Sequence, residues 1–221
     1  VDIGKLAGKP VVAVITSMAQ PLGTHIGNAL EVKDAIDVLA GRTQGDLLEI
    51  SLLLGSHMLV LAEKAKTLPE ARAMLENALS SGAGLRKLAE MIAAQGGDPR
   101  VVEDLSLLPQ AAVKRVMRAE TAGYLSAMDT TALGMAAQRM GAGRAKKSDM
   151  LDYSVGYVLH VRLGDEVTED TPLATLYARN EAEAEEAEKA IRKALTIAKE
   201  KPSVPPLWDA VVTAEGITYN R

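Results

Sequence analysis

The sequence contains no cysteine and no phenylalanine, and aromatic residues make up only 3% of its 221 residues. Without cysteine, the chain can form no disulfide bond and can offer no thiolate to a metal or a substrate. The shortage of aromatic rings means that the hydrophobic core has to be built from Leu, Val, Ile, Ala and Met. Because 48% of the residues are hydrophobic, a sizeable core is nevertheless expected.

Charge and targeting signals exclude further classes of protein. The formal net charge of −4 argues against nucleic acid as a partner. The most apolar stretch, residues 47–62, contains Glu49, Ser56 and His57. It is too short and too polar to cross a bilayer, so it predicts a buried helix and no membrane partner. The start at Val1 carries no signal-peptide pattern, and together with the lack of cysteine this predicts a cytoplasmic protein. Because the sequence begins at Val1 and not at Met, a trimmed or partial chain is expected.

Histidines and basic loops offer little evidence of a catalytic or metal site. His25, His57 and His160 lie far apart without zinc-site spacing, so zinc is not expected. His57, within the apolar run, is interpreted as a core histidine with satisfied hydrogen bonds. Within residues 134–149, the two close glycines Gly141 and Gly143 are followed by three bases, Arg144, Lys146 and Lys147, and this stretch could hold a phosphate. A plain loop with solvated lysines is the favoured interpretation.

The pattern over residues 9–40 is that of a strand, a loop and a helix. Residues 9–18, KPVVAVITSM, are apolar on both faces, which predicts a buried parallel strand. Residues 28–40 carry a helical apolar stripe, with Asn28 as the expected N-cap and Glu31 three residues later. Between them lies a Pro-Leu-Gly turn. In open α/β sheets such a loop lies where ligands bind.

The groups of this loop that could bind a ligand are its hard oxygen atoms. Two or three inward carbonyls of the turn, with the carboxylate of Asp34 one turn into the helix, would suit an alkali or alkaline-earth cation. From spacing alone, a capped helix with solvated acids is the favoured interpretation.

The sequence pattern of the rest of the chain changes near residue 109, from mainly helical to mainly short strands. Before it, helical patterns begin near Asp46 and Thr67, and the first of these is apolar nearly all round and therefore expected to be central. After it, short strands alternate with a helix begun by Asp129 or Thr130. A charged helix then follows, its acids first and its bases last, and the chain closes with a proline-rich tail. Composition therefore divides the chain into residues 1–109 and 110–221.

Six stretches in order resemble the pyrimidine-nucleoside and thymidine phosphorylases. The similarity covers nearly the whole chain. The resemblance implies an α/β (α+β) fold: the later part of a helix-flanked α/β domain of glycosyltransferase type over 1–109, then a barrel-sandwich-like C-terminal domain over 110–221. The matching stretches are residues 11–36, 55–65, 93–104, 108–111, 128–156 and 161–167.

The family resemblance implies an activity that this chain does not carry by itself. Family enzymes, expected to be cytoplasmic homodimers, convert a pyrimidine nucleoside and phosphate to the free base and a pentose 1-phosphate. Their phosphate loop and base-holding residues belong to an N-terminal half whose motifs do not occur here. We therefore expect a C-terminal portion without catalytic or substrate-binding residues, inactive alone.

The resemblance also implies a potassium ion. Its ligands map onto the main-chain carbonyls of Leu22 and His25 and the carboxylate of Asp34, with the others supplied by the phosphate loop. The family usually has Glu at the position of Asp34 and a small residue at that of His25.

Two alternatives to a pyrimidine-nucleoside phosphorylase remain open at this stage. The chain could be a non-catalytic barrel-sandwich module that binds a partner. It could also belong to an archaeal-type nucleotide phosphorylase, which has the same fold and a different substrate. A swinging-arm domain is not expected, because the stretch SAMDTTALG has no lysine.

Overall fold

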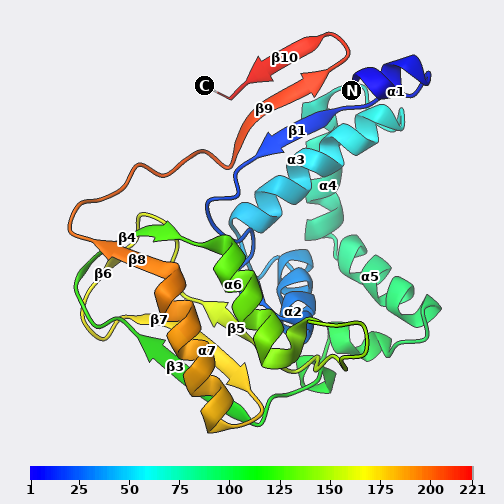
Figure 1. Cartoon of the computed structure of the whole chain (residues 1–221). Helices are drawn as coiled ribbons and strands as arrows, with labels where there is room; N and C mark the ends of the chain where they lie inside the picture. Colours follow the sequence, from blue (N-terminus) through cyan, green and yellow to red (C-terminus); the bar gives the residue numbers. More distant parts are fainter. Residues whose placement is uncertain (221) are drawn as a thin grey trace. The chain divides into compact units, whose positions relative to one another are not determined.

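The computed structural model describes residues 1–220, and its helices are combined with sheets in which every strand pair is antiparallel (Figure 1). The predicted α/β (α+β) class is confirmed. Two compact units interleave along the sequence: unit 1 comprises Val1–Ser17, Asp37–Gly97 and the chain from Pro205 onward, and unit 2 comprises Met18–Ile36 and Asp98–Val204. These units follow packing, whereas the division into 1–109 and 110–221 follows composition and stays a prediction.

Unit 1 combines helices with a three-stranded sheet of order β1-β9-β10. Its small core joins Val38 to α3 and α4 through leucine side chains. Thr67 caps α4 by accepting a hydrogen bond from the Glu70 N–H, as its sequence position predicts. The elements are α1 (Asp2–Leu6), β1 (Ala13–Thr16), α3 (Asp46–Leu61), α4 (Leu68–Ser80), α5 (Ala83–Ala94), β9 (Trp208–Thr213) and β10 (Gly216–Tyr219).

The prediction of a buried parallel strand over residues 9–18 is wrong. Strand β1 pairs antiparallel with β9, and Ile15 is 48% exposed. An apolar run reports that a segment favours extended backbone and burial, but it does not encode the direction or sequence distance of the partner strand. The partner comes from the proline-rich tail, which forms the β9–β10 hairpin.

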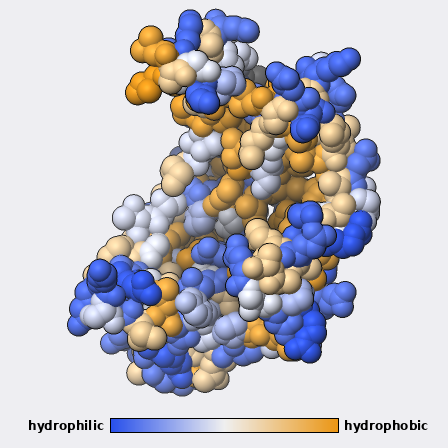
Figure 2. Space-filling model, turned by 90° about the vertical axis from the view of Figure 1, so that its right-hand side faces the viewer, coloured by the Kyte–Doolittle hydropathy of each residue, from blue (hydrophilic) through white to orange (hydrophobic). Residues whose placement is uncertain are grey.

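The prediction that α3 is central is also wrong. Leu48, Ile50 and Leu52 are buried, but Leu54 is 41% exposed and Met58 68% exposed. Hydrophobic side chains likewise reach the surface among hydrophilic ones on the face shown in Figure 2. Uniform hydrophobicity thus indicates the length of this helix correctly, but not how many of its faces are covered.

Unit 2 contains two sheets, of order β2-β5-β7-β3 and β6-β4-β8. Helix α6 packs beside α7, and α7 lies against β3 and β7 (Figure 1). Strand β5 pairs antiparallel with β7, and the predicted helix begun by Asp129 or Thr130 and the charged helix after it are confirmed as α6 and α7. Helix α2 (Asn28–Leu39) belongs to unit 2 as far as Ile36, and its last residues belong to unit 1. The other elements of unit 2 are β2 (His25–Ile26), the 3-10 helices η1 (Pro99–Val102) and η2 (Leu105–Leu107), β3 (Val113–Arg118), β4 (Gly123–Met128), α6 (Thr130–Ala137), the π-helical turn η3 (Gln138–Ala142), β5 (Gly156–Leu159), β6 (Glu166–Val167), β7 (Pro172–Ala178), α7 (Glu181–Ala194) and β8 (Leu195–Ala198).

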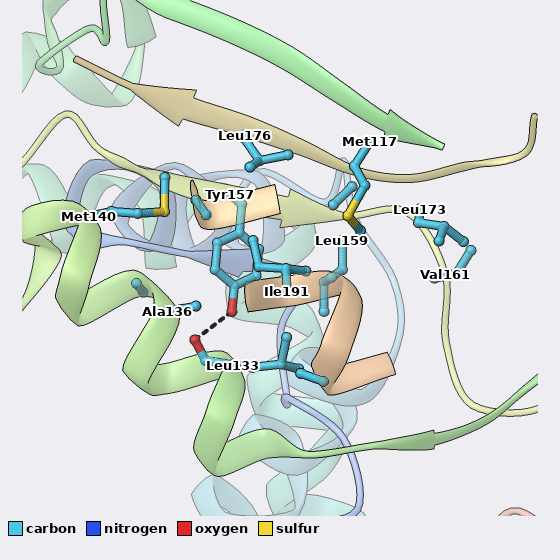
Figure 3. Packing of buried hydrophobic residues seen from close by; sticks show 14 of the residues in the cluster. Met117, Leu133, Ala136, Met140, Tyr157, Leu159, Val161, Leu173, Leu176 and Ile191 are labelled. Atoms are coloured by element: carbon cyan, nitrogen blue, oxygen red, sulfur yellow. Dashed lines mark hydrogen bonds between the residues drawn. The ribbon is translucent and has the colours of Figure 1, made fainter. Parts of the chain in front are cut away.

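The main hydrophobic core of the described residues lies in unit 2 (Figure 3). Leu159, Leu176 and Ile191 are among its fully buried members. Tyr157 is the one aromatic residue in this cluster, and its hydroxyl donates a hydrogen bond of 2.8 Å to the Leu133 carbonyl of α6. Burial raises the pKa of the Tyr157 hydroxyl, so it stays a neutral donor. Aliphatic packing, as the composition predicts, therefore supplies most of this core.

None of the helices in the described residues has both the length and the apolar character that a bilayer crossing requires.

Replacing Tyr157 with Phe should lower the free energy of unfolding by about 1 kcal/mol, because the ring stays packed while a buried hydrogen bond is lost. Urea unfolding followed by circular dichroism measures the change. Tyr219→Phe, at a residue that is 58% exposed, is the matched control and should have little effect. Equal stabilities of the two variants would contradict the role given to the Tyr157 hydroxyl.

Candidate functional site

The segment that carries the predicted cation ligands is held against β5 by a close backbone approach. Gly27 and Gly156 both have positive φ angles, +133° and +148°. A Cβ atom on Gly156 would lie 2.1 Å from the Ile26 carbonyl oxygen and 2.9 Å from Gly27 Cα. Only glycine fits there, so the start of α2 lies directly on the start of β5.

Helix α2 is capped differently from the prediction. Asn28 is its first residue, and its side-chain amide donates to the Ala142 carbonyl at 2.8 Å instead of capping the helix. Gly27 takes the cap position: its carbonyl accepts from the Glu31 N–H at 2.8 Å, and its own N–H donates to the Glu31 carboxylate at 3.2 Å. The cap therefore lies one residue earlier than predicted, and the Glu31 carboxylate accepts from the cap N–H from four residues along the chain.

The Pro-Leu-Gly turn is gathered around the guanidinium of Arg162. Nη1 of Arg162 donates to the Pro21 carbonyl at 2.6 Å and to the Gly23 carbonyl at 3.4 Å, and Nη2 donates to the Leu22 carbonyl at 3.5 Å. The carbonyls of this turn therefore converge on the Arg162 guanidinium, and their use as cation ligands stays a prediction. The sequence reasoning missed Arg162, because about 140 residues separate it from the loop and no local pattern marks the contact.

His25 lies at the edge of the four-stranded sheet. Strand β2 pairs only with β5, with His25 opposite Val158, and the Leu159 N–H donates to the Thr24 carbonyl at 2.8 Å. In an antiparallel ladder, successive residues direct their N–H and C=O groups to opposite sides. The His25 carbonyl therefore faces away from β5.

The side chains of His25 and Asp34 come together. Nδ1 of His25 lies 3.4 Å from Oδ1 of Asp34 and 3.0 Å from the Thr24 hydroxyl. Asp34 is 4% exposed, although it is an acidic residue in the middle of a helix. A buried carboxylate requires a compensating partner. The imidazole of His25 is one such partner. The prediction named only the carbonyl of His25 and did not include this side-chain contact.

The oxygen donors fit an alkali cation in kind. Main-chain carbonyls and one carboxylate are hard ligands of the type that potassium takes. The Leu22 carbonyl already accepts from Arg162, so a cation there would use its second lone pair. Among residues 1–220, no three His, Asp or Glu side chains are grouped to hold a metal. The assignment of Leu22, His25 and Asp34 as ligands stays a prediction.

The remaining sequence candidates are satisfied within the chain, with one exception. The N–H groups of Ala145 and Lys146 donate to Asp149, which favours the plain-loop interpretation of residues 134–149 over a phosphate site. Nε2 of His160 lies 2.7 Å from the Thr175 hydroxyl. The expectation for His57 is wrong, because its Nε2 is buried without a hydrogen-bond partner among the described residues.

Comparison with known proteins identifies the family. The family model for the pyrimidine nucleoside phosphorylase C-terminal domain matches residues 124–198, from β4 to β8. The pyrimidine-nucleoside phosphorylases of Geobacillus stearothermophilus and Bacillus subtilis are each 49% identical over 181 residues, which is 82% of this chain and 42% of each relative. The Staphylococcus aureus protein of the same name is 42% identical over 213 residues, or 96% of this chain and 49% of the relative.

This chain belongs to the pyrimidine-nucleoside phosphorylase family. It matches the C-terminal portion of its relatives and spans less than half of their length. The matched family domain contains Arg162 and the β5–β7 pair, which support the loop of residues 20–24. The resemblance seen in the sequence is therefore confirmed, and the candidate cation loop lies on a framework that belongs to the family.

The lowered pKa values of His57 and His160 predict a loss of stability in mild acid. Burial lowers the pKa of His57, and burial with the nearby charge of Lys114 lowers that of His160. The unfolded chain then binds a proton more readily than the folded chain, so stability falls as the pH drops below about 6.5. A His57→Met variant should lose less stability than the wild type between pH 7.5 and 5.5, as measured by urea unfolding. Parallel pH curves for the two proteins would contradict this.

Proposed function

We propose that this chain forms the C-terminal portion of an enzyme that transfers a pentosyl group from a pyrimidine nucleoside to phosphate. The observation that supports this is the 49% identity over 181 residues to relatives named pyrimidine-nucleoside phosphorylase. The products are the free base and a pentose 1-phosphate. The proposal extends to the complete enzyme, acting as a homodimer, because the chain spans about half the length of the curated relatives it matches.

The chain's contribution, in this proposal, is a scaffold together with half of a cation site. Phosphorolysis requires hydrogen-bond donors that hold phosphate and a proton for the departing base. We assign neither role to a residue of this chain. In the glycine-containing stretch of residues 134–149, the N–H groups of Ala145 and Lys146 are already bonded to Asp149. Phosphate and base binding then come from the portion of the relatives that precedes the match.

Potassium is the cation that we propose for the loop. The carbonyls of Leu22 and His25 and the carboxylate of Asp34 would hold it, together with oxygens of the phosphate loop. A cation that gives up its water among carbonyls is stabilised by one full negative charge, which Asp34 supplies. The bound ion would contribute positive charge that draws the phosphate loop against residues 20–34. This role would explain the presence of an acidic side chain at a position that is only 4% exposed.

The first test is complementation. The chain alone should not convert uridine or thymidine in the presence of phosphate. A chimera that joins the N-terminal portion of the B. subtilis relative to this chain should be active, within about tenfold of the intact relative, because the two sequences are 49% identical over the exchanged region. Release of free base measures both. An inactive chimera that is folded and dimeric would contradict the proposal, as would full activity of the chain alone.

The second test concerns the carboxylate. In the active chimera, Asp34→Asn should raise the potassium concentration needed for half-maximal activity by about tenfold or more, because the charge that offsets cation dehydration is removed. Asp34→Glu, which restores the usual family side chain, is the matched control and should keep the response. A potassium response that is the same in the Asn variant and the parent would exclude Asp34 as a ligand.

A further inference from the structure

The loop of residues 20–24 directs several carbonyl oxygens toward one place, which is unfavourable without a positive charge among them. Parallel carbonyl dipoles repel each other, and a converging set is stable only around a cation or hydrogen-bond donors. Arg162 supplies donors to three successive carbonyls, those of Pro21, Leu22 and Gly23. A planar guanidinium can do this because its N–H groups form a rigid fork.

The main chain that carries Arg162 is itself firmly held. The Arg162 N–H donates to the Asp165 carboxylate at 2.7 Å, and the Asp165 N–H donates to the Arg162 carbonyl at 3.1 Å, which closes a tight turn. This turn is tied to β4 through Leu125, whose N–H and carbonyl bond Asp165 and Gly164 respectively. The guanidinium therefore projects from a fixed base.

A second contact ties the loop to the same turn. The Leu163 N–H donates to the Gln20 side-chain oxygen at 2.9 Å. Farther along, the Leu159 N–H of β5 donates to the Thr24 carbonyl. The loop is thus attached at both of its ends to the segment that runs from β5 to the turn at residues 162–165, with the Arg162 fork between the two attachments.

We propose that Arg162 is the positioning residue of the cation loop: its guanidinium holds the carbonyls of residues 21–23 in the arrangement that a cation ligand set requires. The strongest contact is with Pro21, at 2.6 Å, and the weakest is with Leu22, at 3.5 Å. The fork therefore fixes the path of the loop next to the Leu22 ligand and leaves that oxygen able to accept a second partner. The functional meaning of this inference rests on the proposed cation site, but its structural content does not.

Amide hydrogen exchange in the full chain tests the structural content directly. The reporters are the Leu159 and Leu163 amides, whose acceptors lie in the loop. The His160 amide, which donates to the Leu173 carbonyl of β7 at 2.9 Å, is the internal control. Arg162→Met should speed exchange at both reporters about tenfold or more and leave the His160 amide within about twofold of the parent.

Two further variants sharpen the exchange result. Arg162→Lys keeps the charge but loses the fork, so exchange at the reporters should be intermediate. Arg118→Met is the matched control, because Arg118 also donates to a main-chain carbonyl, that of Asp170 at 2.7 Å, in a different loop. It should change neither reporter. Unchanged reporters in Arg162→Met would overturn the proposal, and so would equal acceleration of all three amides, which indicates general loss of stability.

The cation readout uses the active chimera. Arg162→Met should raise the potassium concentration for half-maximal activity at least threefold, while the maximal rate at saturating potassium stays within about twofold of the parent. A loss of maximal rate with an unchanged potassium response would overturn a positioning role. Should the parent chimera show no potassium response, the proposed cation site fails, and the exchange data still decide whether Arg162 organises the loop.

Discussion

The antiparallel pairing of β5 with β7 is the constraint on which unit 2 depends. Strand β5 pairs with β7 on one side and with β2 on the other. Its Tyr157 and Leu159 enter the core that α6 and α7 cover. Its first residue, Gly156, touches the backbone at the start of α2. Core packing and the position of the candidate loop therefore follow from the same strand, and a shift of its register by one residue would displace both.

Backbone groups, more than side chains, define the candidate site. Two of the three predicted cation ligands are carbonyl oxygens: that of Leu22 lies in the loop that Arg162 contacts, and that of His25 lies in β2. The family resemblance predicts a small residue at the position of His25, and a carbonyl ligand places little demand on the side chain attached to it. The carboxylate of Asp34 does make such a demand, because a charge that is nearly buried requires compensation. In this chain the imidazole of His25, 3.4 Å away, is part of that compensation.

Local signals were reliable wherever the physics is local. The caps Thr67 and Asp129 accept the hydrogen bonds that their positions predict, because a cap is decided within three residues. Helix α7 shows the same agreement, with buried alanines and Ile191 on one face and charges on the other. The cap of α2 lies one residue before the predicted one, because the Asn28 side-chain amide donates to the Ala142 carbonyl instead of capping the helix. No local pattern encodes that contact.

Sequence by itself determined the family, the fold class, most element types and the aliphatic nature of the core. Periodicity, capping and family motifs depend on residues that are close together in the chain. Tertiary structure alone decided the antiparallel partner of β1, the exposed face of α3, the unsatisfied Nε2 of His57 and the contact of Arg162 with residues 21–23. Each of these joins or separates groups that are distant in the chain. Their energies depend on which surfaces meet, and a one-dimensional pattern does not specify that.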